Sequence, residues 1–188
     1  LALPGGDDFG GRPIDMHLSG LEAMGAEFEV TDEGIVGRTS GRLKGADITF
    51  AFPSVGATEN ILMAAVVADG VTTISNAARE PEIGDLCAML RSMGAHIDGV
   101  GTSTLVIRGV NPASMQSCVH DVVSDRVQAA TYIAAVAMCG GDIEVQRAVP
   151  GHMEMLLTRY ADMGMSILPI DDGLRVSCHQ RLSAVDVA

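Results

Sequence analysis

The segment IGDLCAMLRSMGAHIDGVGTSTLVIRG, from Ile83 to Gly109, decides the fold. Its first half has apolar residues at helical spacing and ends at Met93-Gly94-Ala95, where a glycine in the left-handed region can terminate a helix. Its second half alternates apolar and polar residues around a glycine-rich turn, as β-hairpins do. The segment therefore predicts a helix followed by a two-stranded hairpin.

The same pattern occurs twice more along the chain. Helix-like segments end at Met24–Ala26 and at Met163–Met165, and the hairpin-like sequences EFEVTDEGIVGR and SILPIDDGLRVSC follow them. Apolar helices expected from Ser54 and from Ser124 share this period, and each precedes a strand, VTTISNA or DIEVQRA. A further strand, in ADITFAF or in the region of VHDVV, is expected to lead into each of these helices.

These segments together predict a chain of the α/β (α+β) class built from tandem units. A period of about 70 residues is too long for a solenoid of helical pairs, so the units should cluster around shared buried helices. The segment Gly109–Asp121 shows no clear period. We therefore place a boundary near its end and predict two parts, residues 1–121 and 122–188.

Charge and hydrophobicity exclude several classes of function. The net charge is −12 and Lys44 is the only lysine, which argues against a nucleic-acid partner. No apolar run approaches the roughly 20 residues that span a bilayer, and we recognise no secretory signal, so we expect a cytoplasmic protein without a membrane partner. Any anion site must then be built from single arginines and helix N-termini.

The cysteines give no metal signature. None of the four forms a CxxC pair, and the neighbours Cys118/His120 and Cys178/His179 match no known ligand spacing. Cys87 and Cys139 lie in apolar helical patterns, which predicts that both are buried and reduced. We therefore expect no metal.

A glycine-rich stretch, LPGGDDFGGRPIDMHLSGLEAMGA from Leu3, precedes the first predicted helix. It carries two adjacent carboxylates, and it places Arg12-Pro13 at the start of the helix with Asp15 and His17 close behind. A mobile loop that brings an arginine onto a helix start is suited to closing over an anionic substrate.

Four stretches together carry a resemblance to a known family. They are LPGGDDFGGRPIDMHLSGLEAMGA, GRLKGADITFAFPSVGATEN, NAAREPEIGDLCAMLRSMGA and the Ser124–Arg126 tripeptide. In this order and spacing they resemble the UDP-N-acetylglucosamine 1-carboxyvinyltransferases, which are enolpyruvyl transferases. The resemblance implies two inside-out, barrel-like α/β lobes, each made of three βαβαββ units.

The resemblance also implies that these residues are a central slice of a longer enzyme. Residues 1–121 would belong to the lobe that carries the active-site loop and the UDP-sugar contacts, and residues 122–188 would be one repeat of the second lobe. A Lys-Asn pair, the aspartate base and further arginines of the family would lie in the missing remainder of the chain. The slice alone should therefore be inactive.

The family reaction transfers enolpyruvyl from phosphoenolpyruvate to the 3′-hydroxyl of UDP-N-acetylglucosamine and releases phosphate. It is the first committed step of peptidoglycan synthesis and so bears on cell shape and cell division. Both substrates are small molecules that carry phosphate groups, and the family resemblance implies no organic cofactor.

Asp7 matches the loop cysteine that is usual in the family, which fosfomycin alkylates. A carboxylic acid can still donate a proton, and the neighbouring Asp8 together with desolvation would raise its pKa from about 3.9. We therefore predict that Asp7 keeps the catalytic role. We also predict fosfomycin resistance, because a carboxylate is a poorer nucleophile than a thiolate.

The start of the first helix matches several of the family's ligand contacts. Arg12 is the strongest candidate for a catalytic anion contact, because a guanidinium binds phosphate in a bidentate way. Pro13, Ile14 and Asp15 match substrate-binding positions, and Pro13 and Asp15 would frame the uracil. His17 matches a histidine near the site. Taken alone, Pro13 would be a first helical residue, Asp15 a first-turn acid and His17 a half-buried helix histidine.

Two further segments match substrate contacts. Ser54, Val55 and Gly56 open a predicted helix whose free N–H groups would bind a diphosphate. The family often has a lysine before this serine, whereas this chain has Phe52-Pro53. Glu80 matches an acidic residue at the site rim, although helix capping and an ion pair with Arg79 would also explain it.

Two alternatives remain open at this stage. The chain could belong to a paralogous enolpyruvyl transferase that uses another acceptor, or to a non-catalytic homologue that binds a nucleotide sugar.

Asp125-Arg126 matches residues at the crossing between lobes, which we interpret as hinge and site-rim candidates.

Overall fold

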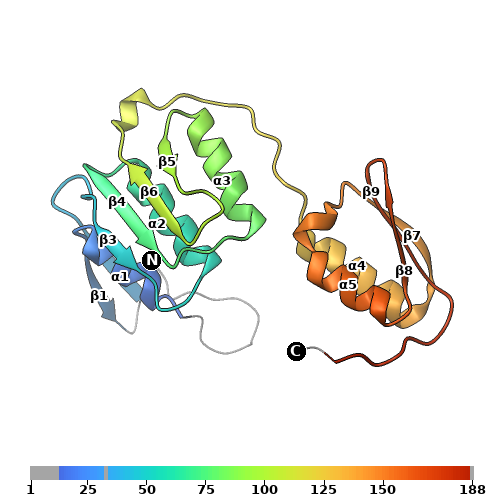
Figure 1. Ribbon diagram of the computed structural model, residues 1–188. Coiled ribbons are helices and arrows are strands. Elements are labelled where there is room, and N and C mark those ends of the chain that lie inside the picture. The colour runs from blue at the N-terminus through green and yellow to red at the C-terminus, as the bar shows by residue number, and fades with distance from the viewer. Residues whose placement is uncertain (1–12, 32–33, 187–188) are drawn as a thin grey trace. The chain divides into compact units, whose positions relative to one another are not determined.

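The computed structural model describes residues 13–31 and 34–186, which form two compact units (Figure 1). Unit 1 spans Leu1–Asp121 and unit 2 spans Val122–Ala188. In chain order, the elements of unit 1 are α1 (Asp15–Ala23), β1 (Glu27–Thr31), β2 (Gly34–Arg38), β3 (Asp47–Thr49), α2 (Val55–Val66), β4 (Val71–Ser75), α3 (Pro81–Ser92), β5 (His96–Asp98), β6 (Thr104–Arg108) and a 3₁₀ turn, η1 (Pro112–Ser114). Those of unit 2 are α4 (Arg126–Cys139), β7 (Gly141–Gln146), a 3₁₀ turn η2 (Pro150–His152), α5 (Glu154–Asp162), β8 (Ser166–Ile170) and β9 (Gly173–Cys178).

Unit 1 contains one complete βαβαββ repeat, which runs from β3 to β6. Its sheet has the order β3-β4-β6-β5, in which β3 pairs with β4 in parallel and the other two pairings are antiparallel. The helices α2 and α3 pack with this sheet around a core that contains Ile61, Leu62, Ile74 and Leu105, all fully buried. The predicted α/β architecture is therefore confirmed.

The glycine-terminated helices are also confirmed. Gly25, Gly94 and Gly164 each follow the last helical turn with φ of 95°, 105° and 101°. Each is followed by an antiparallel hairpin, formed by β1 with β2, β5 with β6, and β8 with β9. A glycine adopts this positive φ without steric cost, so a Met-Gly pair terminates three different helices.

Unit 2 repeats most of this arrangement. Its sheet has the order β7-β9-β8 with antiparallel pairings throughout, which corresponds to β4-β6-β5 of unit 1. The helix α4 covers this sheet and buries Ile133 and Val136 against Leu174 and Val176. No strand among residues 34–186 pairs with the other edge of β7, where β3 would correspond.

The predicted strand in VHDVV is wrong. Residues 115–125 form no regular element, and Val119 is fully exposed. The chain here runs along α3 instead, where the Gln116 N–H donates to Met93 O at 3.0 Å and His120 Nε2 lies 2.9 Å from Asp85 Oδ1. These contacts occupy the segment, so it does not reach the edge of a sheet.

The predicted burial of cysteine is correct for one residue and wrong for the other. Cys87 is fully buried in α3, and this burial raises the pKa of its thiol. Cys139 is exposed at the end of α4. The reason is that unit 2 covers only one side of α4, so that Tyr132 and Met138 are exposed as well.

Candidate functional site

The N-terminus of α2 has the geometry of an anion site. Ser54 is the N-cap, as predicted, and its Oγ accepts a hydrogen bond from Ala57 N at 3.3 Å. The first N–H groups of a helix have no partner within the helix, and the helix dipole adds positive potential there. Val55 is half-buried and Gly56 is exposed, so a ligand can reach this end of the helix.

The helix α1 lies beside this N-terminus. His17 Nδ1 is 3.1 Å from Asn60 Nδ2, and a Cβ added to Gly56 would lie 3.5 Å from His17 Cε1. One turn further along, Gly20 approaches Ile61 so closely that its added Cβ would lie 2.6 Å from Ile61 Cδ1. The two helices therefore run in the same direction, and their N-termini lie at the same end of the pair.

The start of α1 differs from the prediction at one residue. The helix begins at Asp15 with Ile14 as its N-cap, so Pro13 precedes the cap and is not the first helical residue. Asp15 is an exposed first-turn acid, as the local pattern predicts. Asp7 and Arg12, the two predicted catalytic residues, lie outside the described residues.

The loop that carries Glu80 lies against the first turns of α2. Thr58 Oγ1 accepts a hydrogen bond from the Ala78 N–H at 3.0 Å, and both residues are buried. Glu80 is half-buried and is the N-cap of α3, but its side chain makes no capping bond. Its Oε2 instead accepts from the backbone N–H of Arg79 at 2.9 Å. Glu80 thus occupies the capping position of α3, as the alternative predicts, but it does not cap the helix through its side chain.

The structure therefore brings several predicted residues to one region of unit 1. His17 of α1 lies beside Gly56 of α2, Ser54 and Val55 precede Gly56, and the loop before Glu80 is bonded to Thr58. Sequence reasoning missed Thr58 and Asn60, although both belong to the SVGATEN stretch. Their spacing of two and four residues from Gly56 is the only signal that could have indicated them.

Asp125 and Arg126 lie in unit 2, where Asp125 has a structural role. Its Oδ1 accepts from Val127 N at 2.8 Å and from Gln128 N at 3.1 Å, which makes it the N-cap of α4. A capping carboxylate of this kind satisfies two N–H groups and favours the helix dipole.

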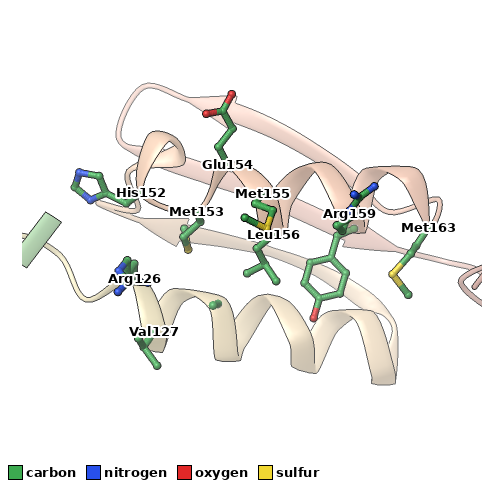
Figure 2. A pocket seen from close by; sticks show the side chains of 11 residues that line it. Arg126, Val127, His152, Met153, Glu154, Met155, Leu156, Arg159 and Met163 are labelled. Atoms are coloured by element: carbon green, nitrogen blue, oxygen red, sulfur yellow. The ribbon is translucent and has the colours of Figure 1, made fainter. Parts of the chain in front are cut away.

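A cavity of about 680 Å³ lies between α4 and α5, within unit 2. Figure 2 shows Met153 and Leu156 pointing toward α4, whereas Glu154 points away. The cavity is lined mainly by apolar side chains, and of the residues singled out from the sequence only the site-rim candidate Arg126 contributes to it. Its lining residues are Arg126, Val127, Ala130, His152, Met153, Glu154, Met155, Leu156, Arg159, Tyr160 and Met163.

The parts of the chain that the structure describes contain no cluster of three or more metal-ligating side chains. They also contain no helix that is both long and apolar enough to cross a bilayer. What the candidate site offers a ligand is thus backbone N–H groups, an imidazole and carboxylates.

Comparison with known proteins shows the family of this chain. Residues 1–188 match the family model described as EPSP synthase (3-phosphoshikimate 1-carboxyvinyltransferase), and the chain belongs to this family. Its relatives include the UDP-N-acetylglucosamine 1-carboxyvinyltransferase of Mycobacterium leprae, which is 50% identical over 188 residues. The enzyme of the same name from Acinetobacter baylyi is 48% identical over 176 residues, 94% of this chain and 42% of its own length.

The chain spans 44% of the length of the Mycobacterium leprae relative, although all of the chain is matched. Solved structures share the fold at lower identity. The enolpyruvyl transferase NikO from Streptomyces tendae has a TM-score of 0.75 and 23% identity over 91% of this chain and 43% of its own. EPSP synthase from Acinetobacter baumannii has a TM-score of 0.60 and 22% identity, covering 88% of this chain and 38% of its own.

Proposed function

We propose that this chain is part of an enzyme that transfers enolpyruvyl from phosphoenolpyruvate to the 3′-hydroxyl of UDP-N-acetylglucosamine and releases phosphate. The observation that carries this proposal is the 50% identity to an enzyme of that name over all 188 residues. The reaction is a step of peptidoglycan synthesis. The protein would act in the cytoplasm and support cell-wall formation, cell shape and cell division.

The substrate diphosphate would bind at the N-terminus of α2. The N–H groups of Val55 and Gly56 and the hydroxyl of Ser54 are the donors, and the parallel α1 adds a second helix dipole at the same end. The chain has a net charge of −12, which repels anionic ligands, so the positive ends of the helix dipoles are needed to attract the diphosphate. Phe52-Pro53 supplies no cation before Ser54, so the affinity depends on these donors.

The remaining contacts come from both helices and the loop before them. Pro13, Ile14 and Asp15 would frame the uracil, His17 would contact a substrate oxygen, and Glu80 would lie at the rim of the site. Arg12 would bind the phosphate of phosphoenolpyruvate. Two anionic substrates would thus be held by the start of α1 and the start of α2.

Asp7 would supply the proton for the chemical step. In the addition, the sugar oxygen attacks the substituted alkene carbon while the methylene carbon takes a proton from the carboxylic acid. Elimination returns that proton and expels phosphate. The base that deprotonates the sugar hydroxyl would come from the remainder of the longer chain, so residues 1–188 alone are expected to be inactive.

A phosphate-release assay on the full-length protein tests this function. Release that requires both phosphoenolpyruvate and UDP-N-acetylglucosamine supports it. A folded protein that binds UDP-N-acetylglucosamine without releasing phosphate would instead be a non-catalytic homologue. Phe52-Pro53 favours a second candidate, a paralogue with another acceptor, and that enzyme would release phosphate only when a different acceptor is supplied.

A further inference from the structure

The contact between His17 and Asn60 joins two helices at the candidate site. The His17 Nδ1 and Asn60 Nδ2 atoms are 3.1 Å apart, and both side chains are half-buried. A carboxamide nitrogen carries two hydrogens and cannot accept a hydrogen bond. With the Asn60 amide nitrogen on this side, Nδ1 of His17 is the acceptor in this contact.

The other ring nitrogen faces the start of α2. A Cβ added to Gly56 would lie 3.7 Å from His17 Nε2 and 3.5 Å from Cε1, so this edge of the ring lies directly over Gly56. In a neutral imidazole whose Nδ1 is an acceptor, Nε2 carries the proton. The ring edge that carries Nε2 thus lies beside the first turn of α2, where the free N–H groups of the helix are.

We propose that Asn60 is a positioning residue that holds His17 in the Nε2–H tautomer, so that the ring donates a hydrogen bond to an anionic oxygen bound at the N-terminus of α2. The opposite tautomer would direct a lone pair of electrons at that oxygen and repel it. The tautomer follows from the Asn60 contact alone, whereas its use in binding the nucleotide diphosphate rests on the proposed function.

Gly56 keeps the space under the imidazole edge open. Gly56 has no side chain, so nothing of residue 56 lies between the imidazole edge and the backbone donors of α2. The helix that carries the ring is also held in place, because the close approach of Gly20 to Ile61 packs α1 against α2. A donor that is held rigidly by its neighbours binds a ligand at a lower entropic cost.

The first experiment measures the tautomer directly. The full-length protein is labelled with ¹⁵N-histidine, and the His17 signals are assigned by comparison with H17Q. We expect an unprotonated Nδ1 and a protonated Nε2 in the unchanged protein. N60D should reverse this pattern or protonate both nitrogens, because a carboxylate accepts from Nδ1–H. N60L should give a mixture of tautomers.

The control is E59Q, which changes a charge on the same turn of α2 and keeps the Asn60 amide. Its His17 signals should match those of the unchanged protein, and circular dichroism should show that every variant is folded. A protonated Nδ1 in the unchanged protein, or an N60L spectrum identical to it, would overturn the inference.

The second experiment measures the consequence for substrate. In the phosphate-release assay, N60L should raise KM for UDP-N-acetylglucosamine about two- to threefold, because only part of a mixed population carries the proton on Nε2, with a smaller change in kcat. An unchanged KM would overturn the role in binding. An inactive parent with the expected tautomer would refute the proposed function and leave the role of Asn60 in setting the tautomer intact.

Discussion

The buried hydroxyl of Thr58 accepts a hydrogen bond from the backbone N–H of Ala78 at 3.0 Å, and this bond joins α2 to the loop that carries Glu80. T58V keeps the shape of the side chain and leaves the buried N–H of Ala78 without this partner. We expect the free energy of unfolding to fall by about 1–3 kcal/mol.

The chain offers a matched control for this substitution. Thr72 is equally buried in β4, and its Oγ1 has no hydrogen-bond partner within the described structure. T72V should therefore leave the stability unchanged or raise it. Urea unfolding of both variants measures the difference, and equal losses of stability would contradict the role given to the Thr58 hydroxyl.

The close contact of α1 with α2 predicts an unusual response to alanine. Alanine normally favours a helix over glycine by about 0.5–1 kcal/mol. At Gly20, however, the new Cβ would lie 2.6 Å from Cδ1 of the fully buried Ile61, and overpacking costs about 1–3 kcal/mol. G20A should therefore destabilise the protein, and adding I61V should recover part of the loss.

Gly84 in α3 provides the comparison, because an added Cβ there meets no atom within 4 Å. G84A should raise the thermal midpoint, as the helix preference alone predicts. A gain in stability from G20A as large as that from G84A would show that α1 and α2 are less closely packed than described.

The ion pair between Asp142 and Arg175 predicts a dependence of stability on pH. Arg175 donates to both carboxylate oxygens at 2.9 and 2.8 Å, and these hydrogen bonds lower the pKa of Asp142 from its ordinary value of 3.8. Because the pKa of Asp142 is lower in the folded state, the ion pair stabilises the protein at any pH above the ordinary pKa. This stabilisation is lost as the pH falls through the pKa of the folded state.

D142N should therefore flatten the acid limb of a plot of unfolding free energy against pH, measured in urea at low salt. R175Q should flatten it in the same way, and the double variant should show no further change. Because both side chains are partly exposed, high salt should weaken the effect in the unchanged protein.

The segment after η1 is held to α3 by His120 and Asp85, whose side chains are only 18% and 20% exposed. D85A removes the partner of His120, so the segment should open more often. If the free energy needed to open the segment falls by about 1 kcal/mol, the open form becomes roughly five times more populated. Cleavage becomes faster by the same factor when its rate is proportional to that population. Limited proteolysis with mass spectrometry would locate the cuts. D98A, which breaks an exposed ion pair with Arg108, should not accelerate cleavage in this segment.

The proposed role of Asp7 predicts a gain of sensitivity to an inhibitor. If Asp7 occupies the position of the family's loop cysteine, phosphate release by the full-length protein should persist in fosfomycin, and D7C should create a thiolate that the drug alkylates. Inactivation of D7C should be time-dependent and irreversible. D8C, one residue away, should remain resistant, and irreversible inactivation of the unchanged protein would refute the assignment.

The sequence predicted the elements whose cause is local. The glycines at positions 25, 94 and 164 and the turns that follow them fix helix ends and hairpins through backbone conformation alone, and Ser54 caps α2 through a neighbouring N–H group. The strand expected in VHDVV failed because a strand needs hydrogen bonds from a neighbour. Its residues have the apolar character of a strand, but the segment is bonded to α3.

The candidate site was predictable in its residue types but not in its geometry. The resemblance indicated His17 and Gly56, yet no local signal places a histidine of α1 over a glycine of α2. The Asn60 contact joins residues 43 positions apart, so only the packing of the two helices reveals it. In the same way, the exposure of Cys139 depends on what covers α4, which a helical pattern does not specify.

Among residues 34–186 no strand pairs with one edge of β7, and this open edge has a consequence for the behaviour of unit 2 at high protein concentration. An open strand edge can serve as a template for another copy of itself. This strand, however, carries Asp142, which is paired with Arg175, and Glu144, and two copies paired edge to edge would bring their Glu144 carboxylates together. Repulsion between these carboxylates therefore opposes edge-to-edge pairing. Low pH and high salt weaken this repulsion, so association between copies should begin under those conditions.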